Sequence, residues 1–515
     1  MAFPQVPKDL FQSLGLEELS MTIWINLTFL AGVLIWWTYN LFFHPLASYP
    51  GPFLARVSWI YHAIHTYRGT LAENTKRLHD RYGEVVRIAP NILSLNDGQA
   101  WEDIYGRGHG NAYAFVKDPG KEFRLPNSPP SIGFAPEKDH RRYRRILSYA
   151  FSEKSITEHE PLVLKHVDSL MSSLHQQVNL SQGSFINIEK SMTAIMFDLT
   201  TDLSFGQSFG SVNSPNISHP WMSLVTSSLK GVSVYCAMRR LLPHGLWPFV
   251  DQIMGKAPSG SKIEALNFAK QVVGKRLQNV VDHNDFMTYM IESHGVPDGL
   301  SRREIERLAL SLVIAGSDTT STLLCNTIYR LSQHPQVLQE LLQQIQETAP
   351  SSSEITFSAV KKMPYLTAVL EECLRMLPPV PNVFPRVVPR EGVTICGHFV
   401  PGGSIVGVSQ LSANMSSKHF SQPAEFLPTR WLGREEFHHD NRRARKPFSY
   451  GPRNCAGQNA AYMHSKIIIA RLVSEFDISL DPTCLDWPQR CKSYDTVEKP
   501  PLYLKLFPRP NGTEK

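Results

Sequence analysis

Cys455 is the residue of this sequence whose surroundings point most directly to chemistry. It lies in the run Phe-Ser-Tyr-Gly-Pro-Arg-Asn-Cys-Ala-Gly, residues 448–457, where Gly451 and Pro452 predict a turn. A helix is expected to follow over residues 456–476. Free backbone N–H groups and the helix dipole favour a thiolate at such a position and lower its pKa. The pattern predicts a reactive or metal-binding sulfur.

Two chemistries are open to this thiolate. A nucleophilic cysteine needs a base, and His464 lies nine residues further on, out of face on the expected helix. A metal-binding thiolate suits the apolar Phe448 and the cation Arg453 in the same loop. Gly457 would let a flat cofactor approach the backbone. We therefore favour the metal ligand.

A second unusual segment lies at the centre of a long expected helix. Ser301 and Glu304 form a capping box, and the helix runs on to Pro335. Its centre, residues 315–322, reads Ala-Gly-Ser-Asp-Thr-Thr-Ser-Thr, which are mostly poor helix formers. Such a centre in a buried helix indicates either a functional site or a close crossing with another helix.

The remaining elements predict a mainly α-helical protein with small β-sheets. A further helix is expected over 365–377, where Glu372 and Arg375 share one face, and it ends in the proline-rich segment 378–386. The runs with strand character are short; they are residues 85–89, 92–95, 393–396, 404–408 and 503–507. Residues 53–515 read as one domain, with no repeat or linker.

Taken together, these segments resemble the cytochrome P450 superfamily. Residues 448–457 fit its F-x-x-G-x-R-x-C-x-G haem loop, and residues 315–319 resemble its oxygen-activation motif. Glu372 and Arg375 match its E-x-x-R pair, and residues 428–431 resemble its P-x-R-F segment. The motifs occur in the family's order over about residues 45–510. The amino-terminal segments resemble membrane-bound fungal members.

The resemblance implies that haem b is the cofactor and that Cys455 is its axial thiolate ligand, which donates electron density to iron. His140 and Arg144 correspond to the family's W-x-x-x-R pair, although His replaces Trp, and the basic residues 138–145 could instead be a solvated helix face. The cofactor-binding residues that the resemblance implies are Phe448, Gly451, Arg453, Gly457, Arg386, His140 and Arg144.

The resemblance also assigns the acid–alcohol pair to Asp318 and Thr319, which would deliver protons to dioxygen. Glu372, Arg375 and Arg430 would form a buried structural network that holds the haem loop in register. Trp431 stands where the family has Phe, and this difference is expected to change only the volume of the side chain. The residues expected to contact substrate are Phe115, Ile132, Ala315, Val380, Val383 and Phe384.

The implied reaction is monooxygenation of a lipophilic small molecule by dioxygen, with a fungal secondary-metabolite intermediate as the expected substrate. No nucleotide-binding fingerprint occurs, so electrons must come from an NADPH-dependent flavoprotein reductase. The basic residues 442–446 could dock it, or could be a solvated loop. There are two alternatives: a haem-thiolate isomerase or dehydratase, and a haem sensor without catalysis. Neither explains the presence of Asp318 and Thr319.

The amino terminus predicts a membrane anchor. Residues 21–43 contain no charged side chain and are long enough to span a bilayer. Residues 1–20 would be a luminal tail and residues 44–52 a proline-rich hinge. The family topology implies a single-pass protein of the endoplasmic reticulum membrane with a cytoplasmic catalytic domain. The sequons that would then stay unglycosylated are at Asn179, Asn216, Asn414 and Asn511.

Composition excludes several other classes. The chain has 515 residues, of which 42% are hydrophobic and 19% are charged, which excludes a disordered chain, a coiled coil and a polytopic transporter. A net charge of +6 over this length does not imply nucleic-acid binding. Seven cysteines without a C-x-x-C pair make a disulfide framework or a structural zinc site unexpected.

Overall fold

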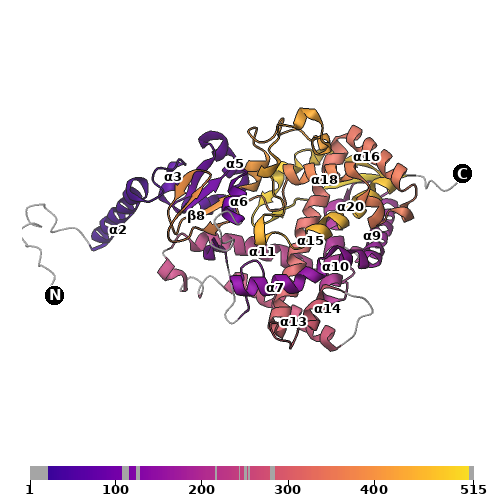
Figure 1. Cartoon of the computed structure of the whole chain (residues 1–515), viewed down its shortest axis with the longest axis horizontal. Helices are drawn as coiled ribbons and strands as arrows, with labels where there is room; N and C mark the ends of the chain where they lie inside the picture. Colours follow the sequence, from indigo (N-terminus) through magenta and orange to yellow (C-terminus); the bar gives the residue numbers. More distant parts are fainter. Residues whose placement is uncertain are drawn as a thin grey trace, which may run out of the picture.

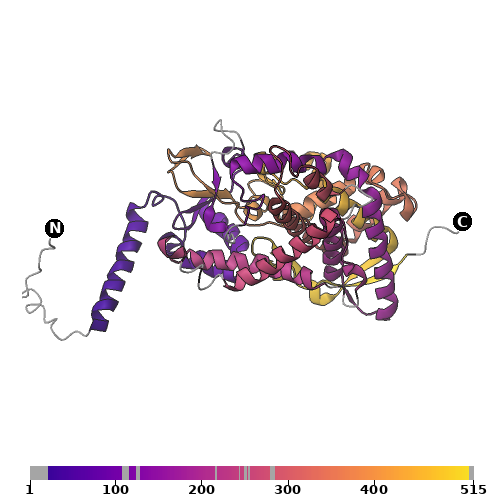
Figure 2. The same ribbon diagram turned by 90° about the horizontal axis from the view of Figure 1, so that it is seen from below.

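The computed structural model describes residues 21–509 except 107–114, 123–127, 215–216, 218, 243, 249–251, 253–255 and 279–284. The expected luminal tail, Asn216 and Asn511 lie outside the described residues. Helix α2 (Met21–Thr38) continues into the π-helical turn η1 (Tyr39–Phe43) and projects from the body in both ribbon views (Figures 1 and 2). Its length and apolar composition make it a candidate membrane span, and 6% of it is buried.

The proline-rich segment after this helix is fastened to the body. The guanidinium of Arg87 donates hydrogen bonds to the carbonyl oxygens of Asn40 at 2.8 Å and Leu46 at 3.3 Å. Arg56 donates to the carbonyl oxygen of Ala47 at 2.9 Å. Because a buried arginine loses several hydrogen bonds if the segment swings away, the connection between anchor and body is stiff.

A five-stranded sheet lies beside the anchor in Figure 1. Its strand order is β1-β2-β8-β5-β3, with β2 and β8 parallel and the other pairs antiparallel. The bounds are β1 Val85–Ala89, β2 Ile92–Leu95, β8 Ile405–Val408, β5 Arg386–Val387 and β3 Val116–Lys117. The strands expected at 85–89, 92–95 and 404–408 are therefore present, and the register sets Lys117 opposite Arg386.

Helix α15 (Arg302–Gln333) passes through the middle of the helical part, with α10 (Ile188–Phe205), α18 (Pro364–Met376) and α20 (Gln458–Glu475) packed around it (Figure 1). It begins as the capping box predicts. The Ser301 hydroxyl accepts from the Glu304 N–H, and Glu304 accepts from the Ser301 N–H at 2.8 Å.

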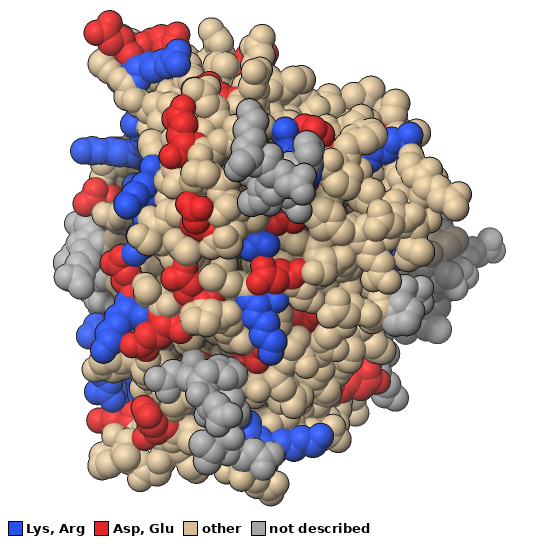
Figure 3. Space-filling view, turned by 90° about the vertical axis from the view of Figure 1, so that its right-hand side faces the viewer, with Lys and Arg blue, Asp and Glu red and all other residues tan. Residues whose placement is uncertain are grey.

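The other elements enclose this centre and complete the mainly α-helical fold that the sequence predicts. The helices among them include α4 Ile60–Arg68, α5 Leu71–Tyr82, α6 Ala100–Tyr105, α7 Glu137–Ala150, α9 Glu160–Ser181, α11 Pro220–Arg239, α13 Lys256–Gln278, α14 Phe286–Glu292 and α16 Pro335–Thr348. The small sheets are formed by β4 Ile186–Asn187, β12 Tyr503–Pro508 and β9 Phe476–Leu480, by β10 Lys492–Ser493 and β11 Val497–Glu498, and by β6 Val393–Ile395 and β7 His398–Val400. Acidic and basic side chains are interspersed on the face shown in Figure 3.

Candidate active site

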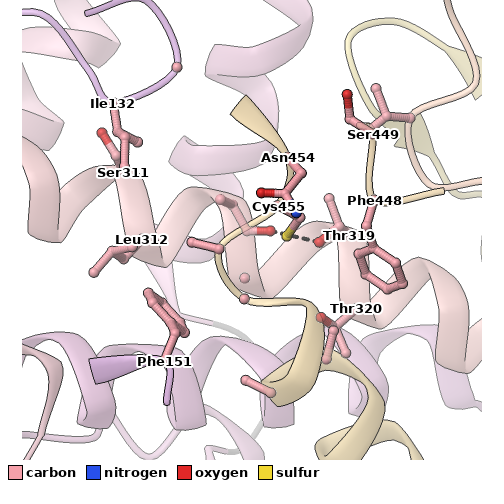
Figure 4. Close-up of a pocket in the computed structure, with 18 of the residues that line it drawn as sticks. Ile132, Phe151, Ser311, Leu312, Thr319, Thr320, Phe448, Ser449, Asn454 and Cys455 are labelled. Carbon is pink, nitrogen blue, oxygen red and sulfur yellow. Dashed lines mark hydrogen bonds between the residues drawn. The ribbon is translucent and has the colours of Figure 1, made fainter. Parts of the chain in front are cut away.

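A cavity of about 420 Å³ separates α15 from the loop before α20. Cys455 and Phe448 line it from the loop, and Thr319 lines it from α15 (Figure 4). Ala315 of α15 also lines it. The apolar side chains that complete its walls include Ile132, Phe151, Met196, Leu203, Phe286, Leu312, Leu323 and Leu374. Such walls suit a large apolar ligand.

The loop that carries Cys455 has a fixed backbone. The Cys455 N–H donates to the carbonyl oxygen of Phe448 at 2.8 Å, which closes the loop. Gly451 has φ 73°, and a β-carbon there would lie 1.8 Å from the carbonyl oxygen of Tyr105. Only glycine satisfies both conditions. The loop therefore presents the sulfur to the cavity from a backbone that tolerates little change.

The electrostatics of Cys455 differ from the sequence expectation. The Cys455 side chain is exposed to the cavity, but the surrounding protein withdraws it from bulk water, and this desolvation raises the pKa of the thiol. The backbone N–H of Gly457 and the charge of Arg144 lower the pKa by smaller amounts. Helix α20 begins only at Gln458, so the helix end is further from the sulfur than expected. A thiolate at this position needs another positive charge, and a metal ion supplies one.

The centre of α15 serves both purposes that its sequence left open. A β-carbon on Gly316 would lie 2.8 Å from Thr200 of α10, so this glycine permits a close helix crossing. Thr319 lines the cavity, and its hydroxyl donates to the carbonyl oxygen of Ala315 at 2.6 Å. Gly316 and Thr200 also line the large cavity, so the helix crossing and the cavity wall share the same two turns of α15.

Asp318 faces away from this cavity. Its carboxylate accepts from Lys499 Nζ at 2.7 Å, and both side chains are almost fully buried. The two residues line a second cavity, of about 330 Å³. Asp318 and Thr319, adjacent in sequence, therefore lie on the walls of two different cavities.

Basic side chains converge at one end of the large cavity. Burial lowers the pKa of His140 to about 3, and the positive charges of Arg453, Arg144, Lys117 and Arg386 lower it further. Burial and the charge of Arg453 also lower the pKa of Arg386 to about 10. The charges that act on His140 are all positive, so an anion at this end would be strongly stabilised.

Sequence reasoning missed Lys117, because its segment was assigned to substrate contacts. Burial lowers the pKa of Lys117 well below its ordinary value, and Arg386 and Arg453 add to the effect. Lys117 lines the cavity and pairs with Arg386 across β3 and β5. Like charges opposite each other destabilise a sheet. No local pattern marks Lys117, because β3 is only two residues long.

A family model described as Cytochrome P450 matches residues 49–506. The chain belongs to the cytochrome P450 family. Relatives include the cytochrome P450 monooxygenases aclL and astJ of Aspergillus oryzae, which are 39% and 38% identical to this chain. These alignments cover 91% and 92% of the chain and 95% and 94% of the relatives. Averantin hydroxylase of Dothistroma septosporum is 36% identical, with 94% of the chain and 92% of the relative covered.

Membership of the P450 family implies haem and the use of dioxygen, and the residues present fit this cofactor. A thiol faces an apolar cavity that is bordered by basic groups, as a haem with two propionates requires. A β-carbon on Gly457 would meet Phe151 at 3.5 Å, an ordinary contact. Packing within the fold therefore does not require glycine at position 457. The close approach of a flat ligand would explain why glycine is present.

The arginines that the sequence predicts to bind the cofactor already make protein contacts. Arg144 donates to the backbone oxygen of Asn454 at 3.0 Å and to its side-chain oxygen at 2.7 Å. Arg453 donates to the carbonyl oxygen of Ala135 at 2.8 Å. The guanidinium of Arg386 lies 5.0 Å from the centre of the Tyr105 ring. Besides contributing a positive charge, Arg144 therefore holds Asn454, the residue before Cys455, in place.

The E-x-x-R residues form a fully buried ion pair. Arg375 donates to the two carboxylate oxygens of Glu372 at 2.9 and 2.7 Å, and Arg430 approaches Glu372 at 3.5 Å. Arg430 also pairs with Asp440, which sequence reasoning missed. Arg375 further donates to the carbonyl oxygen of Pro423 at 2.7 Å. The network therefore fixes the segment that leads into the haem loop.

The expected substrate-contact residues divide into two groups. Ile132, Ala315, Val380 and Phe384 line the large cavity. Phe115 and Val383 do not line this cavity, and we exclude them from the predicted substrate pocket. Phe115 is buried in the core cluster beside the five-stranded sheet. Val383 packs against the core cluster around β1 and β2, because neighbouring residues in an extended segment point to opposite sides.

The basic run 442–446 is only partly solvated. Arg445 is buried and forms an ion pair with Glu371, and Arg442 donates to the carbonyl oxygen of Arg430 at 2.6 Å. Arg443 is exposed. Arg442 is exposed as well. The charge of Arg445 is therefore taken up by its ion pair, while Arg442 and Arg443 keep exposed charge for a partner.

Proposed function

We propose that this P450 is a haem-thiolate monooxygenase that oxidises a lipophilic intermediate of fungal secondary metabolism. The single observation that carries the proposal is that Cys455 and Thr319 line one cavity with a basic end. The reaction is RH + O₂ + 2e⁻ + 2H⁺ → ROH + H₂O. Bound haem would supply the iron that binds and reduces dioxygen.

The chain's own residues have distinct roles in this proposal. Cys455 would hold the iron, with Phe448 beside it in the loop. Arg144, Arg386, Arg453 and Lys117 would hold the propionates, with His140 neutral among them. The Thr319 hydroxyl, which bonds only within its own helix turn, hands protons into the cavity.

The substrate class is supported by the walls of the cavity and by the relatives. Most of the wall is apolar, so binding would be driven by burial of apolar surface. The named relatives come from fungi, and one of them is named for averantin. Averantin is therefore a reasonable first probe compound for this chain.

The proposed setting is the cytoplasmic face of the endoplasmic reticulum membrane. Residues 21–43 would anchor the protein, residues 44–52 would connect the anchor to the body, and residues 53–515 would form the catalytic domain. Electrons would come from an NADPH-dependent flavoprotein reductase. Arg443, together with the exposed Lys138 and Arg141 of α7, offers cations to an acidic partner.

The test begins with the absorption difference spectrum of the reduced full-length protein with and without carbon monoxide. We expect a strongly red-shifted Soret band in the wild type and its loss in Cys455→Ser. The wild type should then oxidise substrate in the presence of reductase, NADPH and dioxygen. A histidine-type band, or no haem, would overturn the proposal.

A second variant tests the oxygen chemistry separately. Thr319→Ala should keep the red-shifted band but release more hydrogen peroxide for each NADPH consumed, because the hydroxyl that hands on protons is gone. Product formation per electron that stays at the wild-type value would exclude the role given to Thr319. Turnover without reductase or dioxygen would favour an isomerase or dehydratase.

A further inference from the structure

Tyr105 lies between the five-stranded sheet and the large cavity. It is the last residue of α6, and it is 3% exposed. It belongs to the core cluster beside the sheet, and Phe384 packs against the same cluster. Phe384 lines the large cavity, whereas Tyr105 does not. Tyr105 can therefore influence a ligand in the cavity only through the residues that it holds.

The hydroxyl of Tyr105 makes two hydrogen bonds to backbone groups. It donates to the carbonyl oxygen of Phe384 at 2.6 Å and accepts from the N–H of Val408 in β8 at 3.1 Å. Burial raises the pKa of Tyr105 to about 12, so the hydroxyl keeps its proton and remains a donor at neutral pH. The phenol therefore joins the segment before β5 to a central strand of the sheet.

This segment before β5 forms part of the wall of the large cavity. Pro379, Val380 and Phe384 line the cavity from it. Strand β5 is only two residues long and begins at Arg386, so the ladder of the sheet does not include Phe384. The place of the Phe384 backbone therefore depends on the hydrogen bond from Tyr105.

Gly407 of β8 provides the space in which these groups meet. A β-carbon at this position would lie 2.7 Å from the carbonyl oxygen of Phe384 and 2.9 Å from the hydroxyl oxygen of Tyr105. Both distances are shorter than β-carbon contacts in proteins, so a larger residue would displace one of the two groups. The hydrogen bond thus depends on a glycine in the neighbouring strand.

Helix α6 also contacts the basic end of the cavity and the cysteine loop. The guanidinium carbon of Arg386 lies 5.0 Å from the centre of the Tyr105 ring, within the range of a cation–π contact. The carbonyl oxygen of Tyr105 packs against Gly451. Trp101, one turn earlier, donates to the carbonyl oxygen of Ala444 at 2.8 Å, in the segment that leads into the loop. The cavity wall and the loop are thus held by one short helix.

We propose that Tyr105 is a positioning residue for the substrate wall: its hydroxyl fixes the place of Phe384 and so sets which ligands the cavity accepts. Loss of the hydrogen bond would free the Phe384 backbone and move the aromatic side chain that an apolar ligand meets. The inference rests on the proposed haem-thiolate function, because it requires a ligand that lies beside haem and reaches this wall.

The test uses two probes that bind haem iron through an imidazole nitrogen, imidazole itself and 1-dodecylimidazole. The full-length holoprotein is titrated with each probe, and the shift of the Soret band gives the Kd. Imidazole is too small to depend on the wall, whereas the dodecyl chain must lie along it. In Tyr105→Phe, which keeps the ring, we expect the Kd of 1-dodecylimidazole to rise about tenfold. The Kd of imidazole should not change.

Gly407→Ala disturbs the same wall while Tyr105 stays intact. Its β-carbon displaces the carbonyl of Phe384, so the Kd of 1-dodecylimidazole should again rise selectively. This variant decides the question if Tyr105→Phe does not retain haem.

Tyr329→Phe is the matched control. Tyr329 is 6% exposed, its hydroxyl donates to the carbonyl oxygen of Leu485 at 2.6 Å, and it lines neither cavity. The variant therefore removes a comparable buried hydrogen bond at a distance from the wall, and both Kd values should stay at the wild-type value.

Three results would each overturn the inference. The first is a wild-type Kd of 1-dodecylimidazole in Tyr105→Phe, or in Gly407→Ala where that variant decides. The second is an equal rise of the Kd for both probes in the same variant, and the third is an equal rise for 1-dodecylimidazole in Tyr329→Phe. The carbon monoxide band separates the two proposals: its absence from the wild type refutes haem-thiolate chemistry, whereas its presence leaves only the role of Tyr105 under test.

Discussion

The indole N–H of Trp431 donates to a carboxylate oxygen of Glu372 at 2.9 Å. The same carboxylate accepts two hydrogen bonds from Arg375, and neither partner of that ion pair is exposed. The tryptophan is therefore a polar member of the network, where the sequence suggested a change of volume alone. A buried carboxylate depends on every donor that it has.

We expect Trp431→Phe to destabilise the holoprotein by about 1–3 kcal/mol, because it leaves one carboxylate oxygen short of a donor. The measurement is the urea concentration at which the Soret band is lost. Trp36→Phe is the control, since Trp36 is 52% exposed on α2. Equal midpoints for Trp431→Phe and wild type would mean that the indole contributes packing only.

Local rules predicted several elements, because each of these has its signal within a few residues. The capping box at Ser301 and the stop at Pro335 gave the bounds of α15, and the turn at Gly451 gave the shape of the cysteine loop. The pairing of Glu372 with Arg375 also follows from i, i+3 spacing. These features need no knowledge of the rest of the chain.

Contacts between segments that are distant in the sequence could not be predicted from local patterns. Lys499 reaches Asp318 from the carboxyl-terminal region, and nothing in either neighbourhood indicates the pair. Lys117 became a member of the basic end only through its register with Arg386. Desolvation likewise reversed the expected pKa shift of Cys455, because desolvation depends on the whole fold.

Lys117 offers a prediction about the proposed haem site. In Lys117→Met we expect faster haem loss and a reduction potential more negative by some tens of millivolts. A neighbouring propionate would restore the charge on Lys117 that burial disfavours, and this cation would stabilise the reduced state. A spectroelectrochemical titration measures the potential. Lys121→Met removes the same charge four residues away, where the side chain pairs with Asp495 at 3.1 Å, and should change the potential less. Equal shifts of the reduction potential in both variants would show that Lys117 is not part of the haem site.

His464 predicts a dependence of stability on pH. Burial lowers its pKa to about 3, and the nearby His159 and His166 add to the effect. The unfolded chain binds a proton near pH 6.5 while the folded protein does not, so stability falls as pH drops below that value. Between pH 7.5 and 5.5 this histidine should cost about 1.4 kcal/mol of unfolding free energy.

The measurement compares urea unfolding of wild type and His464→Leu at the two pH values. The variant should lose about 1.4 kcal/mol less than wild type over this range. His439→Leu, at an exposed position, should keep the wild-type dependence. If His464→Leu and wild type lose the same free energy, the pKa of His464 is the same in the folded and the unfolded protein.

Asn179 reports on the orientation in the membrane. It is exposed on α9, whereas Asn414 is fully buried and could not carry a glycan in the folded protein. With the body in the cytoplasm, Asn179 stays unmodified despite its sequon, because the modifying enzyme acts in the lumen. Treatment of the protein from microsomes with an endoglycosidase should therefore leave its mobility unchanged. A mobility shift that Asn179→Gln abolishes would place the body in the lumen, away from a cytoplasmic reductase.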